Sequence, residues 1–305
     1  MSLETDLLLD RRRLKRRLSF WRILAVVAVV IAALAGTVRA IGVGGPSHHI
    51  TRVTVSGMIG DNRKLTEAID KLAKDKSVAA VILSIDSPGG AVSGGESLHD
   101  AIEHVAAVKP VVTVMGGLAA SAGYMIAVPA ARIFARESTL TGSIGVLLET
   151  GEVSGLLGKL GISAETITSG PLKDQPGLTH PLSDAGRVVL NEIVADLYDQ
   201  FVQIVAKGRH MDADKVRSLA DGRAYTGRQA LKLGLVDEIG DETTAREWLA
   251  KEKSVPMTVP VQDLKADDWR SQLRSELTGA ISDALSGVSA RQSVRLDGAW
   301  AVWQP

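Results

Sequence analysis

Apolar residues form one long run near the start of the chain and then short runs separated by polar segments. The long run covers residues 20–38, where Arg22 is the one charged residue. A helix needs about 20 apolar residues to cross the hydrocarbon core of a bilayer. The run therefore predicts a transmembrane helix over residues 20–40. A cleaved signal peptide is the alternative, but the apolar part of such a peptide is usually only about 7–15 residues long.

The flanks of this run predict its orientation. Residues 11–17 read "RRRLKRR", and basic segments beside a membrane helix stay in the cytoplasm. Residues 1–19 are thus expected to be cytoplasmic, and the body is expected on the outer (periplasmic) side of a bacterial inner membrane. The Gly/Pro-rich stretch 41–47, "IGVGGPS", predicts a linker.

The short apolar runs predict alternating strands and helices. Continuous apolar stretches such as residues 78–85 are typical of parallel strands that are buried on both faces. This alternation predicts an α/β fold with helices against a mostly parallel sheet. Strands are expected at residues 49–59, 78–85, 111–115, 132–135, 144–149 and 235–239, and helices at 63–75, 95–108, 183–209 and 225–234.

The composition changes after Pro256. Residues 261–290 predict one amphipathic helix, and the tail "RLDGAWAVWQP" carries two tryptophans. We therefore divide the body into a domain over residues 48–255 and a C-terminal extension of unknown role over residues 256–305.

Charge and cysteine content narrow the function classes. The 35 basic and 35 acidic residues balance, so no overall field favours nucleic acid as a partner. Cysteine is absent, which excludes disulfides and leaves the redox compartment undecided.

Two loops rich in small residues follow successive predicted strands. "DSPGGAV" at residues 86–92 could form an anion cradle or an oxyanion hole, and no phosphate-binding glycine motif supports the first reading. "GGLAASAGYMIA" at residues 116–127 carries Ser121, which is either a helix cap or a nucleophile. Parallel strands present their carboxyl ends on one edge of the sheet, so we expect the two loops to lie close together.

A serine nucleophile needs a base. None of the six histidines lies in a strand-end context that would direct it at Ser121, and no metal-binding histidine spacing occurs. Lys173 in "TSGPLKD" is the other candidate. A lysine acts as a base only when neutral, which requires burial to lower its pKa from about 10.4. Without such surroundings, Lys173 would be a solvated loop residue.

Five motifs occur in an order that resembles one family. "DSPGGAV", "MGGLAASAGYMIA", "TLTGSIGV", "TSGPLKD" and "DGRAYTGRQALKLGLVDEIG" follow one another behind the predicted anchor. Together they resemble the signal peptide peptidase A family, bacterial serine peptidases with a Ser/Lys dyad. The resemblance covers about residues 50–250 and is closest to the short, single-repeat form. It implies a ClpP/crotonase fold of repeated β-β-α units.

The resemblance also implies roles for single residues. Ser121 matches the nucleophile, Lys173 the general base, and Ser143 the hydroxyl that orients the lysine. The backbone N–H groups of Gly90 and Ala122 match the oxyanion hole. The family often has glycine where this chain has Ala122, and the extra methyl group is expected to narrow the pocket.

The family likeness implies peptide hydrolysis without a cofactor or metal. Its members cleave remnant signal peptides and other hydrophobic peptides, act at the membrane and assemble as homo-oligomers. Three alternatives remain: a Ser/Lys peptidase with another envelope substrate, an acyl-CoA-binding crotonase relative, and an inactive crotonase-like scaffold.

Overall fold

The computed structural model describes residues 21, 24–27, 29, 48–264 and 300–302. The chain divides into two compact units, residues 1–47 and 48–305. The predicted cytoplasmic segment, the linker and most of the predicted transmembrane helix lie outside the described residues. Within the part of the chain that is described, no helix has the length and apolar character needed to span a membrane.

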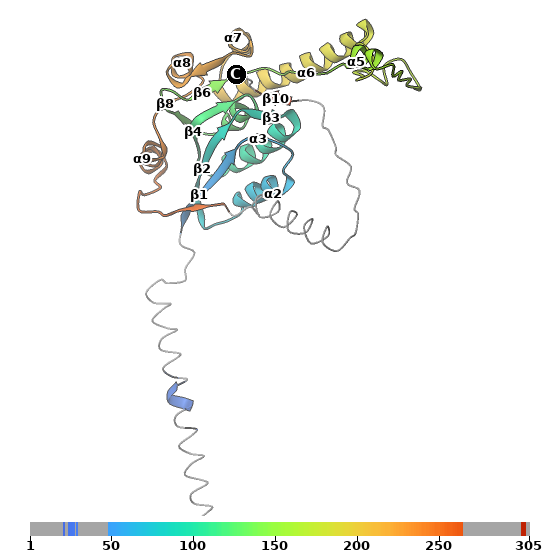
Figure 1. Cartoon of the computed structure of the whole chain (residues 1–305). Coiled ribbons are helices and arrows are strands. Elements are labelled where there is room, and N and C mark those ends of the chain that lie inside the picture. Colours follow the sequence, from blue (N-terminus) through green and yellow to red (C-terminus); the bar gives the residue numbers. More distant parts are fainter. Residues whose placement is uncertain (1–20, 22–23, 28, 30–47, 265–299, 303–305) are drawn as a thin grey trace, which may run out of the picture. The chain divides into compact units, whose positions relative to one another are not determined.

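The second unit is built on a mostly parallel sheet (Figure 1). Its main path runs β7-β6-β4-β2-β1-β9, and β5 pairs with both β4 and β8. All pairs in this sheet are parallel except β6 with β7. The strands are β1 (His49–Ser56), β2 (Val78–Ser87), β4 (Val111–Ala120), β5 (Arg132–Ala135), β6 (Leu140–Gly142), β7 (Ala224–Thr226), β8 (Glu238–Ile239) and β9 (Val261–Asp263). The predicted α/β class is therefore confirmed.

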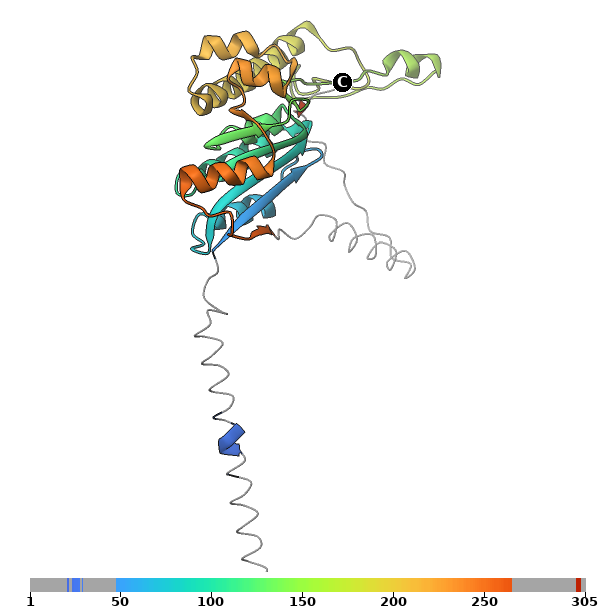
Figure 2. The same cartoon turned by 90° about the vertical axis from the view of Figure 1, so that its left-hand side faces the viewer.

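Helices cover both faces of the sheet, which explains the continuous apolar runs in its strands. Along β2, Val81, Leu83 and Ile85 belong to the larger core, which also includes residues of α2 and α3. The alternate residue Ile82 belongs to a second core beneath Leu249 of α9. Figure 2 shows α9 in front of the sheet and the helices α2 and α3 behind it. The helices are α2 (Arg63–Leu72), α3 (Val92–Ala106), α4 (Ala122–Ala127), α5 (Ser154–Lys159), α6 (Asp184–Arg209), α7 (Ala213–Leu219), α8 (Gly227–Leu233) and α9 (Glu242–Lys253).

Local sequence signals set several helix ends. The Ser183 side chain accepts a hydrogen bond from Gly186 N–H and caps α6. Thr226 and Gln229 form a reciprocal capping box at the start of α8. Gly234 ends α8 in the left-handed conformation, with φ 80°, as its position in the sequence predicts.

The structure corrects several expected elements. Residues 144–149 form no regular strand, and the expected helix over 261–290 begins instead with the strand β9; the residues of that helix after 264 lie outside the described part. Strands β2 and β4 extend through Ser87 and Ala120, beyond their apolar runs. The first expected loop also contains a short strand, β3 (Gly89–Ala91). The small residues of both loops predict irregular structure, but parts of both loops are strands. They pair with neighbouring strands of the sheet, as Ser87 does with Ala119.

An arm projects from the body of this unit. The buried side chains of α6 lie mostly in its second half, whereas Val188 and Ile193 in its first half are exposed. Figure 1 shows α6 leading away from the sheet, with α5 near its far end. We call residues 146–193 the arm. Its exposed large apolar residues are Val153, Leu156, Leu160, Ile162, Ile167, Leu172, Leu178, Val188 and Ile193.

Candidate active site

Ser121 stands between the end of β4 and the start of α4. Its N–H donates to the Gly142 carbonyl oxygen (2.8 Å), and its own carbonyl oxygen accepts from Tyr124 and Met125 N–H groups in α4. Strand pairing holds this position from the side, because Ala120 pairs with Gly142 of β6. The serine is therefore fixed by its backbone, and its side chain is not needed for the cap.

The side chain and backbone of Ser121 both have unusual features. The residue has φ 53° and ψ −122°, a conformation that costs a non-glycine residue about 1–3 kcal/mol and persists only where the surroundings impose it. Its hydroxyl is buried and has no hydrogen-bond partner among the described residues. A buried polar group without a partner is costly. The helix-cap reading fails, because the Ser121 side chain makes no capping hydrogen bond.

Gly90 lies at the centre of β3, which packs against α4. Ile59 N–H donates to the Gly89 carbonyl, and Ala91 N–H donates to the Ile59 carbonyl, each at 2.8 Å. Successive residues of a strand direct their N–H and C=O groups to opposite sides. The N–H and C=O of Gly90 therefore face away from Ile59, toward the opposite edge of β3.

Ala122 is the first residue of α4, so its N–H has no acceptor within the helix. The residue is fully buried. A methyl group added to Gly95 of α3 would lie 3.0 Å from the Ala122 Cβ, which places the Ala122 methyl against that helix. The methyl therefore fills space between α4 and α3, and the narrowing of the pocket stays a prediction.

Ser143 lies next to the nucleophile candidate. It follows Gly142, whose carbonyl accepts from Ser121 N–H, and it also has a positive φ, 47°. Its hydroxyl donates to the Gly222 carbonyl oxygen at 3.0 Å. A hydroxyl that donates one bond still has lone pairs to accept another. A cavity of about 420 Å³ opens beside it, lined also by Asn191, Tyr198 and Asp221.

Lys173 lies on the arm and is exposed. Its N–H donates to the Gly170 carbonyl within a local turn. No hydrogen bond or ion pair among the described residues joins its side chain to Ser121 or Ser143. The structure thus brings Ser121, Ser143, Gly90 and Ala122 together in one chain and leaves Lys173 apart from them.

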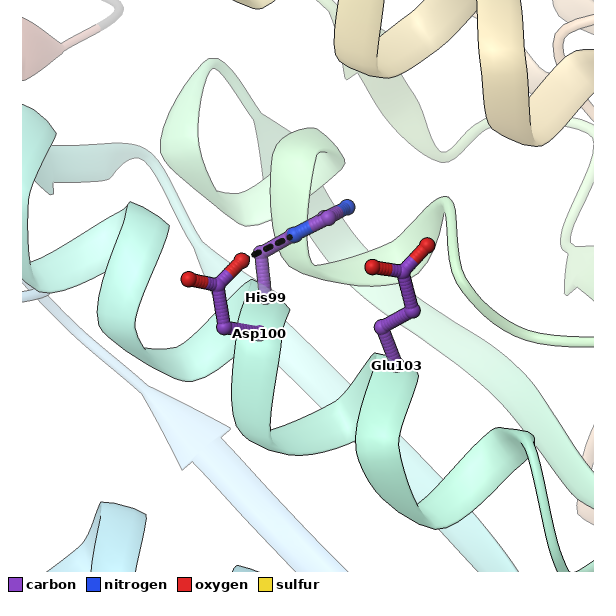
Figure 3. Close-up of side chains that lie close together, drawn as sticks. All are labelled: His99, Asp100 and Glu103. Atoms are coloured by element: carbon purple, nitrogen blue, oxygen red, sulfur yellow. Dashed lines mark hydrogen bonds and ion pairs between the residues drawn. The ribbon is translucent and has the colours of Figure 1, made fainter.

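No histidine among the described residues is placed as a base for Ser121 within one chain. None of them is hydrogen-bonded to Ser121, whose hydroxyl lacks a partner within the described ranges. His99 is buried on α3 and its Nδ1 lies 3.0 Å from Asp100 Oδ1. Figure 3 shows this pair beside Glu103, and the ligand atoms of the three residues lie within 4.8 Å of one another.

This cluster does not make a convincing metal centre. Glu103 Oε1 already accepts from Lys207 Nζ at 2.5 Å, so a lysine ammonium group neutralises the carboxylate that a cation would need. The bond to Lys207 is also the first cause that holds the pKa of Glu103 below its usual range. The cluster is explained as a surface ion pair beside a buried histidine.

Three further residues support this geometry, and none of them is among the site residues selected from the sequence. The Ser87 hydroxyl donates to the Gly57 carbonyl (2.6 Å) and accepts from Gly89 N–H (3.1 Å), which shapes the turn into β3. Asp86 Oδ1 accepts from Leu118 N–H at 3.0 Å and joins the ends of β2 and β4. Ile59 supports β3 through backbone hydrogen bonds with Gly89 and Ala91. The "DSPGG" motif signals the first two, whereas nothing in the sequence signals Ile59.

Comparison with known proteins identifies the family. The model of peptidase family S49 matches residues 103–256, which is half of the chain. The chain belongs to peptidase family S49. The model of Clp protease matches residues 52–152, in agreement with the ClpP-like α/β fold. At the level of the family, the prediction of a serine peptidase is confirmed.

Individual relatives agree with this S49 assignment. An Enterococcus faecium protein provisionally named signal peptide peptidase SppA is 38% identical over 70% of this chain and 66% of its own length. A Synechocystis protein provisionally named a protease is 39% identical over 66% of this chain and 73% of its own. Protease 4 of Salmonella typhi is 34% identical over 73% of this chain, which spans only 38% of that protein.

A structural neighbour was also found. A mutant of ClpP1 from Listeria monocytogenes has a TM-score of 0.42 and 19% identity over 63% of the S49 chain and 92% of its own.

An ion pair lies next to Lys173 in the S49 chain. His180 Nε2 is 2.8 Å from Asp174 Oδ2 and His180 Nδ1 is 3.1 Å from the Pro181 carbonyl oxygen. The Pro181 carbonyl, and then Asp174, raise the pKa of His180 above 6.5. The bond to His180 lowers the pKa of Asp174 below 3.8.

These two shifts predict a pH window for the pair. The contribution of His180 to the free energy of unfolding is fully present below pH 6.5, and it is lost as the pH rises through the raised pKa of His180. The contribution of Asp174 to the free energy of unfolding is present above pH 3.8, and it is lost as the pH falls through the lowered pKa of Asp174. We expect Asp174→Asn to lower the His180 pKa, as measured by proton NMR titration, because the variant loses the carboxylate that raises this pKa. An unchanged His180 titration would show that the pair does not form in solution.

Proposed function

We propose that this chain is a membrane-anchored serine endopeptidase that cleaves remnant signal peptides and other hydrophobic peptides with a Ser121/Lys173 dyad. The observation that carries the proposal is the Ser121 hydroxyl, which is buried and has no partner within the described residues. It stands on a strained backbone beside Ser143 and the β3 strand. Strained, unsatisfied groups of this kind occur at active sites.

The mechanism follows from the roles of these groups. Neutral Lys173 takes the proton from the Ser121 hydroxyl as Oγ attacks the scissile carbonyl. The N–H groups of Gly90 and Ala122 hold the resulting oxyanion, and each such donor contributes about 10²–10³ in rate. The protonated lysine then gives its proton to the leaving amine, and water repeats the two steps on the acyl-enzyme. No step requires a cofactor or metal.

Ser143 is suited to position the lysine. Its hydroxyl donates to Gly222 and retains lone pairs that can accept an N–H from Lys173. The cavity beside Ser143 gives a side chain room to approach. Entry into this part of the protein would also remove the lysine from water, which favours its neutral form.

A second copy of the chain is the proposed source of the lysine. Lys173 is exposed on the arm, and the arm carries many exposed apolar side chains. Contiguous exposed apolar surface marks an interaction site. In a homo-oligomer, the arm of one copy would cover a neighbouring body and deliver Lys173 to the Ser121 of that neighbour.

The proposed location rests on the sequence. The apolar run at residues 20–38 behind a basic segment favours an anchor whose N-terminus is cytoplasmic. The catalytic domain would then act on the periplasmic side of the inner membrane. A different envelope protein as substrate is the closest alternative, and an inactive crotonase-like scaffold is the other.

Mixed oligomers test both the Ser121/Lys173 dyad and the proposal that Lys173 is supplied by a neighbouring copy of the chain. Ser121→Ala and Lys173→Ala are each expected to be inactive against fluorogenic peptides with small or apolar residues before the cleaved bond. When the two variants are co-expressed with different tags and purified through both, activity is expected to return. In a random equimolar mixture roughly a quarter of the sites regain both groups.

The controls separate the possible failures. A mixture of Ser121→Ala with the double variant Ser121→Ala/Lys173→Ala must stay inactive. If Lys173→Ala alone keeps most of the wild-type activity, another group is the base and the dyad is wrong. If both single variants are inactive but their mixture is too, Lys173 acts within its own chain.

A further inference from the structure

The tail of the chain pairs with the strand that carries Gly90. Residues Trp300–Val302 form strand β10, which lies antiparallel to β3. In the register of this pair, Trp300 lies opposite Ala91, Ala301 opposite Gly90, and Val302 opposite Gly89. Figure 1 shows β10 beside β3.

The hydrogen bonds of β3 show which edge the tail covers. The Gly89 carbonyl and the Ala91 N–H are bonded to Ile59. The N–H and C=O of Gly90 face the opposite edge, and this is the edge along which β10 lies. Ala301 therefore lies opposite the N–H group that the proposed mechanism assigns to the oxyanion hole.

A peptide substrate would need the same edge. Extended peptides bind sheet edges as an added strand, with main-chain hydrogen bonds giving affinity. An edge paired with β10 cannot pair with a substrate at the same time. The tail also has the composition of the proposed substrates, since residues 298–303 read "GAWAVW", with small and apolar side chains and no charge.

We propose that residues 300–302 are an internal ligand of the peptide-binding edge of β3, and that they compete with substrate for it. This inference rests on the proposed function for its consequence, which is restrained peptidase activity. The pairing itself can be tested independently of activity. The tail then acts as a built-in inhibitor that a peptide must displace.

A disulfide tests the register without any substrate. If Gly90 and Ala301 exchange hydrogen bonds, Ala91 and Trp300 form the closer, non-hydrogen-bonded type of pair, with Cα atoms about 4.5 Å apart. That spacing suits a disulfide, and the chain has no native cysteine to interfere. The variant Ala91→Cys/Trp300→Cys is expected to form an intramolecular disulfide under mild oxidation, detected by mass and by electrophoretic mobility.

The control pair is Ala91→Cys/Ser289→Cys, which is expected to cross-link far more slowly. Equal rates for the two variants would show that position 300 has no preferred place at β3. Cross-links between two chains, instead of within one, would overturn the internal form of the proposal.

Kinetics and binding test the competition. Ala301→Pro removes an N–H that the pairing uses, and deletion of residues 297–305 removes the strand. Both are expected to lower KM for peptides roughly tenfold with little change in kcat, whereas Gln304→Pro leaves KM unchanged. A synthetic peptide with the sequence of residues 297–305 is expected to inhibit the truncated enzyme competitively. Equal KM values for wild type and both variants would contradict the inference.

A binding measurement keeps the two proposals distinguishable. The fluorescently labelled synthetic tail is expected to bind the truncated protein, and to bind the full-length protein much more weakly, in an anisotropy titration. If no form of the protein hydrolyses peptides but this difference is found, the proposed function fails and the internal ligand stands. If the truncated protein cleaves peptides but does not bind the tail, the internal ligand is wrong.

Discussion

Replacing Ser121 with alanine is expected to reduce peptide hydrolysis by about 10⁴-fold or more, because the variant lacks the atom that forms the acyl-enzyme. The fold should survive, since the Ser121 hydroxyl has no partner within the described part of the chain and the helix cap does not use it. kcat/KM for a fluorogenic peptide measures the loss, and labelling by a serine-directed phosphonate probe should vanish with it.

Ser218→Ala is the matched control, because Ser218 is an exposed serine on α7. It should retain wild-type activity and labelling. A Ser121→Ala variant that still hydrolyses peptides at a tenth of the wild-type rate or more would refute Ser121 as the nucleophile.

A methyl group at Gly90 is expected to damage both activity and stability. A Cβ built there would overlap the carbonyl oxygen of Ile59, so β3 must shift away from it. The shift moves the Gly90 N–H away from its place in the proposed oxyanion hole, and we expect kcat to fall by about 10²–10³-fold. Strain from overpacking should also lower the free energy of unfolding by about 1–3 kcal/mol, measured by urea denaturation.

Gly60→Ala is the matched control for Gly90→Ala, because it makes the same substitution at a nearby position. Gly60 lies in the same segment as Ile59, and nothing lies within 4 Å of a Cβ built on it. The control should keep both activity and stability. If Gly90→Ala behaves like Gly60→Ala, neither the contact with Ile59 nor the oxyanion role of Gly90 can be right.

The sequence predicts the framework of the fold because its strands are buried on both faces. Residues 78–85 and 111–115 are continuous apolar runs, and both lie within central strands of the sheet. Short helices are harder to predict. The pattern of residues raises no clear expectation of α7 or α5, which have few buried side chains to create a periodicity. The strand β9 is also short, and its pairing with β1 depends on residues far away in the sequence.

The candidate site could likewise be predicted only in part from the sequence. Motif order is enough to select Ser121, Gly90, Ala122 and Ser143, which the structure places near one another through the pairs of β4 with β2 and β6. Sequence order gives no information about whether Lys173 reaches Ser121 within one chain. The pairing of β10 with β3 is equally invisible, because it joins residues about 210 positions apart through backbone groups that every sequence has.

The backbone conformation of Ser121 links the proposed peptidase activity to the stability of the fold. Its positive φ suits glycine better than any residue with a Cβ. The residue that we propose as the nucleophile therefore occupies a position where glycine would cause less backbone strain. Natural proteins retain a less stable conformation of this kind where selection acts on catalytic activity. Stabilising substitutions should therefore be sought away from the β4–α4 junction, because there the proposed mechanism predicts that a gain in melting temperature is accompanied by a loss of peptidase activity.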